Sequence, residues 1–251
     1  MVIIGLSLMI YRYFIIDTLS SQDTLWIVDT SLSMAVEDIP GSTPTERMSR
    51  LDRAWEIVKT WITSIAGNHA IMSYARSAAI ESPLTTDRAH LGHVVDSLQP
   101  TLYYWGSDIS AALLLAKSLY GNREVPLRIF WIADGGVLPD ILPDMPDLFA
   151  LTLVGVGSPA WGKIPLGYSV DGERRYRSYS GTEVVVRYDS TPLETLANRY
   201  DGRFLDFGVD SRDLDSVIDA PVSSSVKNSL LIIFSTFLII GYFYHPYARK
   251  K

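Results

Sequence analysis

The feature that most constrains this chain is the apolar run Leu25 to Val28, which stops at Asp29 and continues with hydroxyls at Ser31 and Ser33. A short apolar run bounded by polar residues is typical of a buried strand. Carboxylate and hydroxyl oxygens suit a hard divalent cation such as Mg²⁺, which takes oxygen ligands and keeps several waters. A solvated turn or helix cap uses the same residue types, so the pattern alone leaves both interpretations open.

Two later segments favour the metal interpretation, because each places oxygen atoms at a junction with a strand or helix. Ser107 lies in a polar turn that opens the helical run from Ala111. The apolar run 128–133 ends in Asp134, which two glycines follow. The carboxyl ends of parallel strands are where open α/β sheets bind ligands, so these side chains are candidates for one site.

These three motifs, in this order, resemble those of the von Willebrand factor A (VWA) family over about residues 24–207. Its metal-ion-dependent adhesion site combines Asp-x-Ser-x-Ser with a threonine and a distant aspartate. The resemblance implies a site that holds Mg²⁺, or Mn²⁺ or Ca²⁺, with a serine in place of the usual threonine. The ligands that it implies are Asp29, Ser31, Ser33, Ser107 and Asp134.

Further segments resemble the membrane-anchored VWA proteins of bacterial Bat operons, which are named for aerotolerance. The segments are 82–87, 106–109, and 154–157 followed by 163–166. In that group a neighbouring gene commonly encodes a MoxR-type AAA+ ATPase. The resemblance therefore implies such an ATPase as a partner, together with other VWA or TPR membrane proteins.

Strand-like and helix-like runs alternate after Thr24, which predicts an α/β fold. With the resemblance, we expect a Rossmann-like VWA fold with a mostly parallel central sheet, helices on both faces and flanking transmembrane helices. An exposed hairpin is predicted between Gly167 and Arg187, and Trp55 is expected to lie off the apolar stripe of its helix. Helices are predicted at 50–66, 87–98, 109–119 (buried) and 190–200, and strands at 70–74, 78–84, 127–133, 148–156 and 203–207 (an edge strand).

Apolar segments at both ends predict that the protein is integral to a membrane. We expect a transmembrane segment at 1–19, the VWA domain at 22–219 and a transmembrane helix at 226–246. A cleaved signal peptide is the alternative for the first segment. The basic end, Arg249 to Lys251, predicts a cytoplasmic C-terminus in the bacterial inner membrane. The domain would then face the periplasm or cell exterior, where a cytoplasmic ATPase could reach only the tails or the membrane helices.

Composition excludes several classes of function. The net charge of -6 and the lack of a Lys/Arg cluster in the domain argue against nucleic acid as a partner. Without cysteine there are no disulfides and no thiolate chemistry. Gly-x-Ser-x-Gly, P-loop and HExxH motifs are also absent from the sequence, so no nucleophile is evident.

Several polar residues remain outside the predicted ligand set. Glu37 and Asp38 follow the first motif, and they are either solvated loop charges or groups whose negative charge attracts cations to the site. Asp108 is expected to cap a helix. The aromatic residues 103–105 are candidates for a partner-binding rim or for the core. Carboxylates in the proline-rich loop 139–147 are expected on the surface. A structural or surface role is expected for the histidines, which are His69, His90, His93 and His245.

The resulting hypothesis is a non-enzymatic, membrane-anchored domain that binds a divalent cation and, through it, an acidic residue of a partner protein. A site with few direct carboxylates leaves the ion electrophilic, so an acidic group from a partner can complete its coordination. By the resemblance, it would assist assembly or maturation of envelope or periplasmic proteins. The alternatives are a metal-dependent hydrolase that activates water and a structural membrane subunit with a non-functional metal site.

Overall fold

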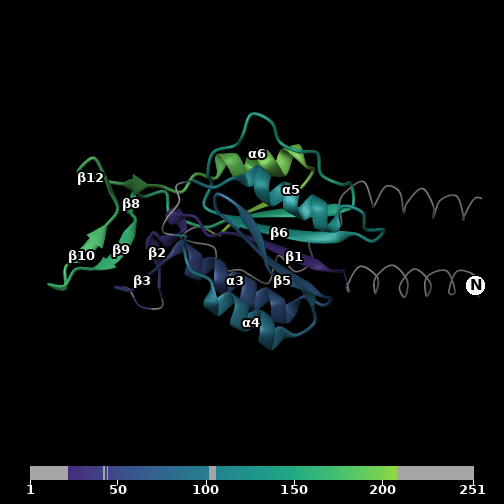
Figure 1. Ribbon diagram of the computed structural model, residues 1–251, viewed down its shortest axis with the longest axis horizontal. Coiled ribbons are helices and arrows are strands. Elements are labelled where there is room, and N and C mark those ends of the chain that lie inside the picture. The colour runs from purple at the N-terminus through teal and green to yellow at the C-terminus, as the bar shows by residue number, and fades with distance from the viewer. Residues whose placement is uncertain (1–21, 42, 44, 102–105, 208–251) are drawn as a thin grey trace, which may run out of the picture. The chain divides into compact units, whose positions relative to one another are not determined.

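The fold is built on a six-stranded sheet in the order β14-β7-β6-β1-β4-β5 (Figure 1). The computed structural model describes residues 22–41, 43, 45–101 and 106–207 of the 251. Contacts divide the chain into units 1–219 and 220–251, and all described residues belong to the first. The sheet strands are β1 (Thr24–Asp29), β4 (His69–Tyr74), β5 (Ala78–Thr85), β6 (Leu127–Ala133), β7 (Phe149–Gly155) and β14 (Arg203–Asp206).

All neighbouring strands are parallel except β4 and β5, which form an antiparallel pair. The strand order places β1 in the interior of the sheet, with β4 on one side and β6 on the other. Every residue of β1 and β4 is buried. Continuous burial is what a parallel strand covered on both faces requires, and it explains why these segments read as apolar runs rather than alternating patterns. The predicted α/β fold with a mostly parallel sheet is confirmed.

Helices cover both faces of the sheet, as expected. In Figure 1, α5 and α6 lie on one side of the strands and α3 and α4 on the other. The predicted helices correspond to α3 (Arg50–Ser64), α4 (Arg88–Ser97), α5 (Ile109–Tyr120) and α6 (Thr191–Arg199), with a short 3-10 helix η2 (Leu32–Ala35) after β1. Each of the four α-helices therefore begins and ends within two residues of its predicted bounds, because the spacing of apolar residues and the capping residues are local signals of a helix.

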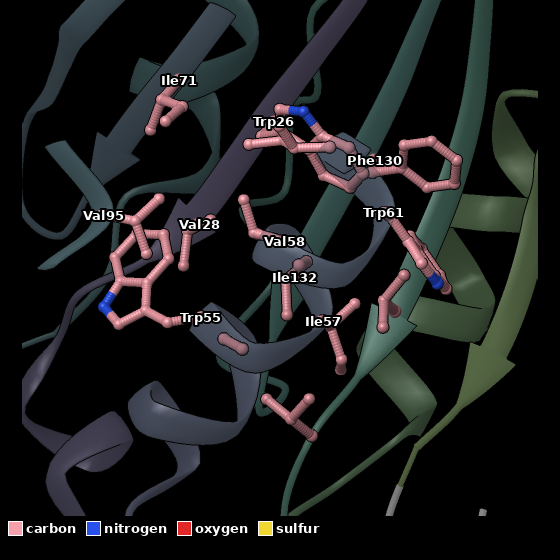
Figure 2. Close-up of a cluster of buried hydrophobic side chains, with 14 of the residues drawn as sticks. Trp26, Val28, Trp55, Ile57, Val58, Trp61, Ile71, Val95, Phe130 and Ile132 are labelled. Atoms are coloured by element: carbon pink, nitrogen blue, oxygen red, sulfur yellow. The ribbon is translucent and has the colours of Figure 1, made fainter. Parts of the chain in front are cut away.

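Aromatic rings dominate the core beneath α3 (Figure 2). Trp26 of β1 stacks on Phe130 of β6 with ring centroids 4.7 Å apart, and Trp61 of α3 lies 4.9 Å from Phe130. Trp55 joins this cluster with only 6% of its surface exposed, so the expectation that it lies off the apolar stripe is wrong. A helix packed between a sheet and a second helix buries a wider arc than one stripe, and α4 covers the additional side.

Helix α5 is less buried than its apolar sequence predicts. Ile109, Ala112 and Leu113 pack on the sheet, whereas Leu114 and Leu119 are about half exposed. The helix lies on the surface of the described unit, so only one of its faces can reach the sheet.

A segment that we call the extension, residues 161–187, continues from the loop after β7. It forms three small antiparallel pairs instead of the single predicted hairpin, and Figure 1 shows several of its strands beside the main sheet. Its strands are β8 (Gly162–Lys163), β9 (Pro165–Tyr168), β10 (Arg174–Tyr176), β11 (Ser178–Tyr179), β12 (Thr182–Glu183) and β13 (Val185–Val186). A further pair, β2 (Ile39–Pro40) with β3 (Arg47–Met48), lies between η2 and α3.

The base of the extension packs on the segment that carries the first motif. Ile164 of the extension joins Leu32, Ala35 and Val36 in a small apolar cluster. Gly162 lies so close to Val36 that a Cβ atom there would be 2.2 Å from Val36 Cγ1. The residues after the Asp-x-Ser-x-Ser motif are therefore held from both sides, by the sheet and by the extension.

No helix among the described residues is long and apolar enough to cross a membrane. Both predicted transmembrane segments, 1–19 and 226–246, lie outside the described residues. The membrane anchors therefore stay predictions.

Candidate metal centre

The candidate site lies where the chain changes direction across the sheet. From β1 the chain runs through α3 to β4 on one side, and it later returns through α5 to β6 on the other side of β1. This arrangement is a topological switch point, and open α/β sheets bind ligands outside the carboxyl ends of their strands at such points. Asp29 is the last residue of β1, and Asp134 directly follows β6.

Asp29 is a fully buried carboxylate with one oxygen left without a partner. Its Oδ1 accepts a hydrogen bond of 2.7 Å from the Ser31 backbone N–H. Its Oδ2 is buried and has no hydrogen-bond partner. Buried acceptors are nearly always paired, so an unpaired carboxylate oxygen calls for an explanation, such as an ion that binds there.

The electrostatics around Asp29 also favour a bound cation. Burial raises the pKa of Asp29 to about 7, and the nearby negative charge of Asp134 also raises it, against the opposing hydrogen bonds from Ser31 and a weaker interaction with the Tyr74 hydroxyl. Burial likewise raises the pKa of the neighbouring Tyr74 hydroxyl well above its usual value, so that group stays neutral. Negative charge at this edge is therefore costly, and a cation would relieve the cost.

The two serines of the motif face each other beside Asp29. Ser31 Oγ lies 3.1 Å from Ser33 Oγ. The turn is fixed by η2, where the Met34 N–H donates to the Ser31 carbonyl and the Val36 N–H to the Ser33 carbonyl. Asp29, Ser31 and Ser33 are thus brought together at the end of β1.

Ser107 lies close to the glycine turn that follows Asp134. A Cβ atom on Gly136 would be 3.1 Å from Ser107 Oγ. Gly135 has a φ of +117°, and a Cβ atom there would be 2.4 Å from the Asp189 carbonyl oxygen, so this position requires glycine. The turn after Asp134 can therefore pass close to Ser107.

Arg50 is a residue of this edge that the sequence analysis missed. Its side chain is fully buried, and its Nη1 donates to Asp134 Oδ2 at 2.6 Å. The other side of the guanidinium donates to both carboxylate oxygens of Asp38, at 2.6 to 3.1 Å. Burial lowers the pKa of Arg50, but its bonds to Asp38 and Asp134 outweigh burial, so its pKa is raised and it stays charged.

Asp38 therefore is not a solvated loop charge. Its Oδ2 also accepts the Ser158 backbone N–H at 3.1 Å, from the loop after β7. One signal in the sequence could have suggested this network: Arg50 is the first residue of a helix, where the helix dipole disfavours positive charge. A basic residue there needs an acidic partner from elsewhere in the chain.

The other sequence predictions near the site have mixed outcomes. Asp108 accepts the Ala111 N–H at 3.1 Å and caps α5, as expected. His69 is buried, with Nδ1 accepting from Trp26 Nε1 at 2.9 Å, which agrees with a structural role. Glu37 forms an ion pair with Arg174 of the extension. The aromatic residues 103–105 lie outside the described residues.

The residues at this edge fit a hard divalent cation. Within the described part of the chain, no three His, Cys, Asp or Glu side chains gather into a metal-binding group. An ion here would instead depend on two aspartates with serine hydroxyls, and such all-oxygen sets suit Mg²⁺ or Mn²⁺ better than softer metals. Asp29 Oδ2, which is buried and has no hydrogen-bond partner, is the strongest candidate for a bond to such an ion.

Comparisons with known proteins agree with this architecture. Residues 24–136 match the family model of the von Willebrand factor type A domain. No curated protein matches the sequence significantly. Solved structures with similar folds include two bacterial proteins, and at this level of identity they bear on the fold alone.

The first is the conserved hypothetical protein BatB from Bacteroides thetaiotaomicron, with 20% identity, a TM-score of 0.64, and coverage of 79% of this chain and 96% of that chain. The second is an aerotolerance-related membrane protein from Bacteroides fragilis carrying multiple mutations to serines, with 21% identity, a TM-score of 0.62, and coverage of 80% and 96%. Residues 24–136 therefore match the von Willebrand factor type A domain, and the fold of the chain resembles the folds of BatB and of the aerotolerance-related protein.

Proposed function

We propose that this protein binds a divalent cation, Mg²⁺ or Mn²⁺, through Asp29, Ser31, Ser33, Ser107 and Asp134. The observation that carries the proposal is the buried Asp29 Oδ2, which has no hydrogen-bond partner and lies in the field of a second carboxylate. The three serines would supply neutral oxygens that orient the ion without cancelling its charge. The ion would stay electrophilic toward an outside ligand.

The ligand that we propose is an acidic residue of a partner protein. An ion that is held mainly by hydroxyls and water gains most from a further carboxylate. Binding rather than catalysis is the proposed role. In the alternative of a metal-dependent hydrolase, the ion would instead activate water.

We further propose that the protein is anchored in a membrane and assists assembly or maturation of envelope proteins with a MoxR-type AAA+ ATPase. This rests on the likeness to Bat-type folds, on the apolar segments at both ends of the sequence, and on the Bacteroides fragilis relative being described as a membrane protein. With the domain outside the cytoplasm, such an ATPase would act through the tails or membrane helices.

Thermal unfolding of the full-length chain in detergent, with Mn²⁺ or with EDTA, tests the metal site. An ion at about 100 times its dissociation constant adds about 2.7 kcal/mol, or roughly 5 to 10 °C for a domain of this size. We expect this gain in the wild type and its loss in Asp29→Asn. The control is Asp140→Asn, an exposed carboxylate outside the ligand set, which should keep the gain.

The EDTA samples separate loss of metal binding from damage to the fold. Asn keeps an oxygen for the Ser31 N–H but removes the charge that Asp134 repels. In EDTA, Asp29→Asn should therefore unfold at the same temperature as the wild type or above it. A wild type with no gain from Mn²⁺ would contradict the metal site and favour the structural-subunit alternative.

A further inference from the structure

Arg50 is the one buried cation in contact with the proposed metal ligands among the described residues. Its guanidinium has no exposed surface and lies between two carboxylates, Asp134 at 2.6 Å and Asp38 at 2.6 Å. Such charge-assisted pairs are the stronger class of hydrogen bond, and their geometry is directional. The pair with Asp134 engages Oδ2, one of the two oxygens that this residue could offer to an ion.

The guanidinium is held in place and cannot move aside easily. Asp38 binds it through both carboxylate oxygens, and Asp38 is itself fixed by the Ser158 N–H. On another side, a Cβ atom on Gly157 would be 3.1 Å from Arg50 Nε, so the backbone already packs closely against it. Arg50 therefore presents a permanent positive charge to Asp134 from a fixed position.

A fixed positive charge beside a ligand opposes binding of another cation. Like charges a few ångströms apart repel each other more strongly in a partly desolvated site than in water. We propose that Arg50 is a built-in competitor of the metal: it shares Asp134 with the ion and keeps the affinity of the site low. Asp38 moderates this effect, because it draws part of the guanidinium charge toward itself.

A weak intrinsic affinity has a functional consequence. If the ion is held loosely by this chain alone, a carboxylate from a partner contributes a larger share of its binding. Metal and partner would then bind cooperatively, each raising the affinity for the other by the same factor. This inference rests on the proposed metal site, and it adds the residue that sets its affinity.

The test is titration of the full-length protein with Mn²⁺, followed by the EPR signal of the free ion. Arg50→Met removes the competing charge and should bind Mn²⁺ about tenfold more tightly than the wild type, or more. In Asp38→Asn the Arg50 charge is no longer shared with Asp38 and acts fully at Asp134, so this variant should bind Mn²⁺ more weakly than the wild type. Arg50→Lys keeps a charge at the site and should remain closer to the wild type than Arg50→Met does.

The matched control is Lys59→Met. Lys59 lies on the same helix and also forms an ion pair, with Asp96, but both partners are exposed. Its removal changes the net charge by the same unit and should leave the Mn²⁺ affinity almost unchanged, because exposed pairs are screened. A gain in Arg50→Met that Lys59→Met does not share supports a local competition.

The outcomes separate this inference from the metal site itself. Arg50→Met that stays folded but binds Mn²⁺ with the wild-type affinity, or more weakly, would overturn the inference and assign Arg50 a purely structural role. Should Arg50→Met fail to fold, Asp38→Asn decides, since equal or tighter binding there contradicts the competition. If the wild type and every variant leave the Mn²⁺ signal unchanged, the metal site and the inference both fail.

Discussion

At the scale of single residues, the molecule retains buried charges whose cost is offset within a few ångströms. Arg50 forms ion pairs with Asp38 and Asp134, whereas Asp29 keeps an oxygen without a hydrogen-bond partner. Removal of one member of a buried pair usually costs about 3 to 5 kcal/mol, because the remaining charge is left uncompensated. The unpaired oxygen of Asp29 is tolerated next to this network, and that contrast is the reason to place an ion there.

His69 predicts a measurable dependence of stability on pH. Burial lowers its pKa to about 4, with help from the positive charge of Arg88, so the folded state holds this ring neutral. The usual pKa of histidine is 6.5, so between pH 6.5 and 4 the ring is protonated in the unfolded state but stays neutral in the folded state. The contribution of His69 to the free energy of unfolding is therefore complete above pH 6.5 and is lost as the pH falls, by about 2 kcal/mol between about pH 7.5 and pH 5.

Urea unfolding of the wild type and of His69→Gln at the two pH values measures this loss as a difference between the two proteins, because protonation of Asp29, whose pKa is raised, changes the stability of both in the opposite direction. The control His90→Gln changes an exposed ring on α4 and should show the same pH dependence as the wild type. His69→Gln removes the titrating ring, so between about pH 7.5 and pH 5 its free energy of unfolding should change by about 2 kcal/mol in the stabilising direction relative to the change in the wild type, whatever its own stability. An unchanged slope in His69→Gln would contradict the assignment to this residue.

At the scale of elements, α3 connects the core to the edge of the sheet that carries the candidate metal site. Its apolar face supplies Trp55, Ile57 and Trp61 to the aromatic cluster, while its first residue is Arg50. The start of this helix therefore controls where the guanidinium lies. A capping box fixes that start: Ser49 Oγ accepts the Asp52 N–H at 3.0 Å, and Asp52 accepts the Ser49 N–H at 3.3 Å.

Ser49→Ala tests this cap. The substitution leaves the Asp52 N–H without its partner and should lower the free energy of unfolding by about 1 kcal/mol. Ser64→Ala is the matched control at the other end of α3, where the exposed hydroxyl bonds the Thr60 carbonyl and contributes little. Urea unfolding of both variants measures the difference, and equal stability of the two would show that the cap does not hold the helix start.

At the scale of the whole described unit, stability is expected to be uneven. β1 and β6 lie inside the sheet with helices over both faces, whereas most side chains of the extension are at least partly exposed. Amide exchange follows local opening, which is rarest where burial and hydrogen bonding are complete. The extension has mainly two-stranded pairs, which are marginal without further packing.

Hydrogen exchange of the native protein, read by mass spectrometry, should therefore show the slowest exchange in residues 24–29 and 127–133. Residues 165–183 should exchange first, and the base of the extension at Ile164 should be intermediate because it packs on Leu32 and Val36. Similar protection in the extension and in the central strands would contradict this order and indicate that the extension opens only with the whole unit.

Local sequence patterns determined most of the elements of this protein. The apolar runs at β1 and β6, the spacing of apolar residues in α3 and the caps before α4 and α5 all act within a few residues, so the helices and central strands could be predicted nearly to their ends. The oxygen atoms of Asp29, Ser31 and Ser33 were evident for the same reason, since they lie directly after a strand.

Only the tertiary structure decided which of these groups meet. Arg50 donates to Asp134, which is 84 positions away in the sequence, and Asp38 accepts the N–H of Ser158, which is 120 positions away. Trp55 is buried by contacts that the periodicity of apolar residues in α3 does not predict. The position of the base of the extension likewise depends on its packing against η2. Periodicity and capping are local, whereas the pairing of buried charges and the burial of a second helix face depend on segments that only folding brings together.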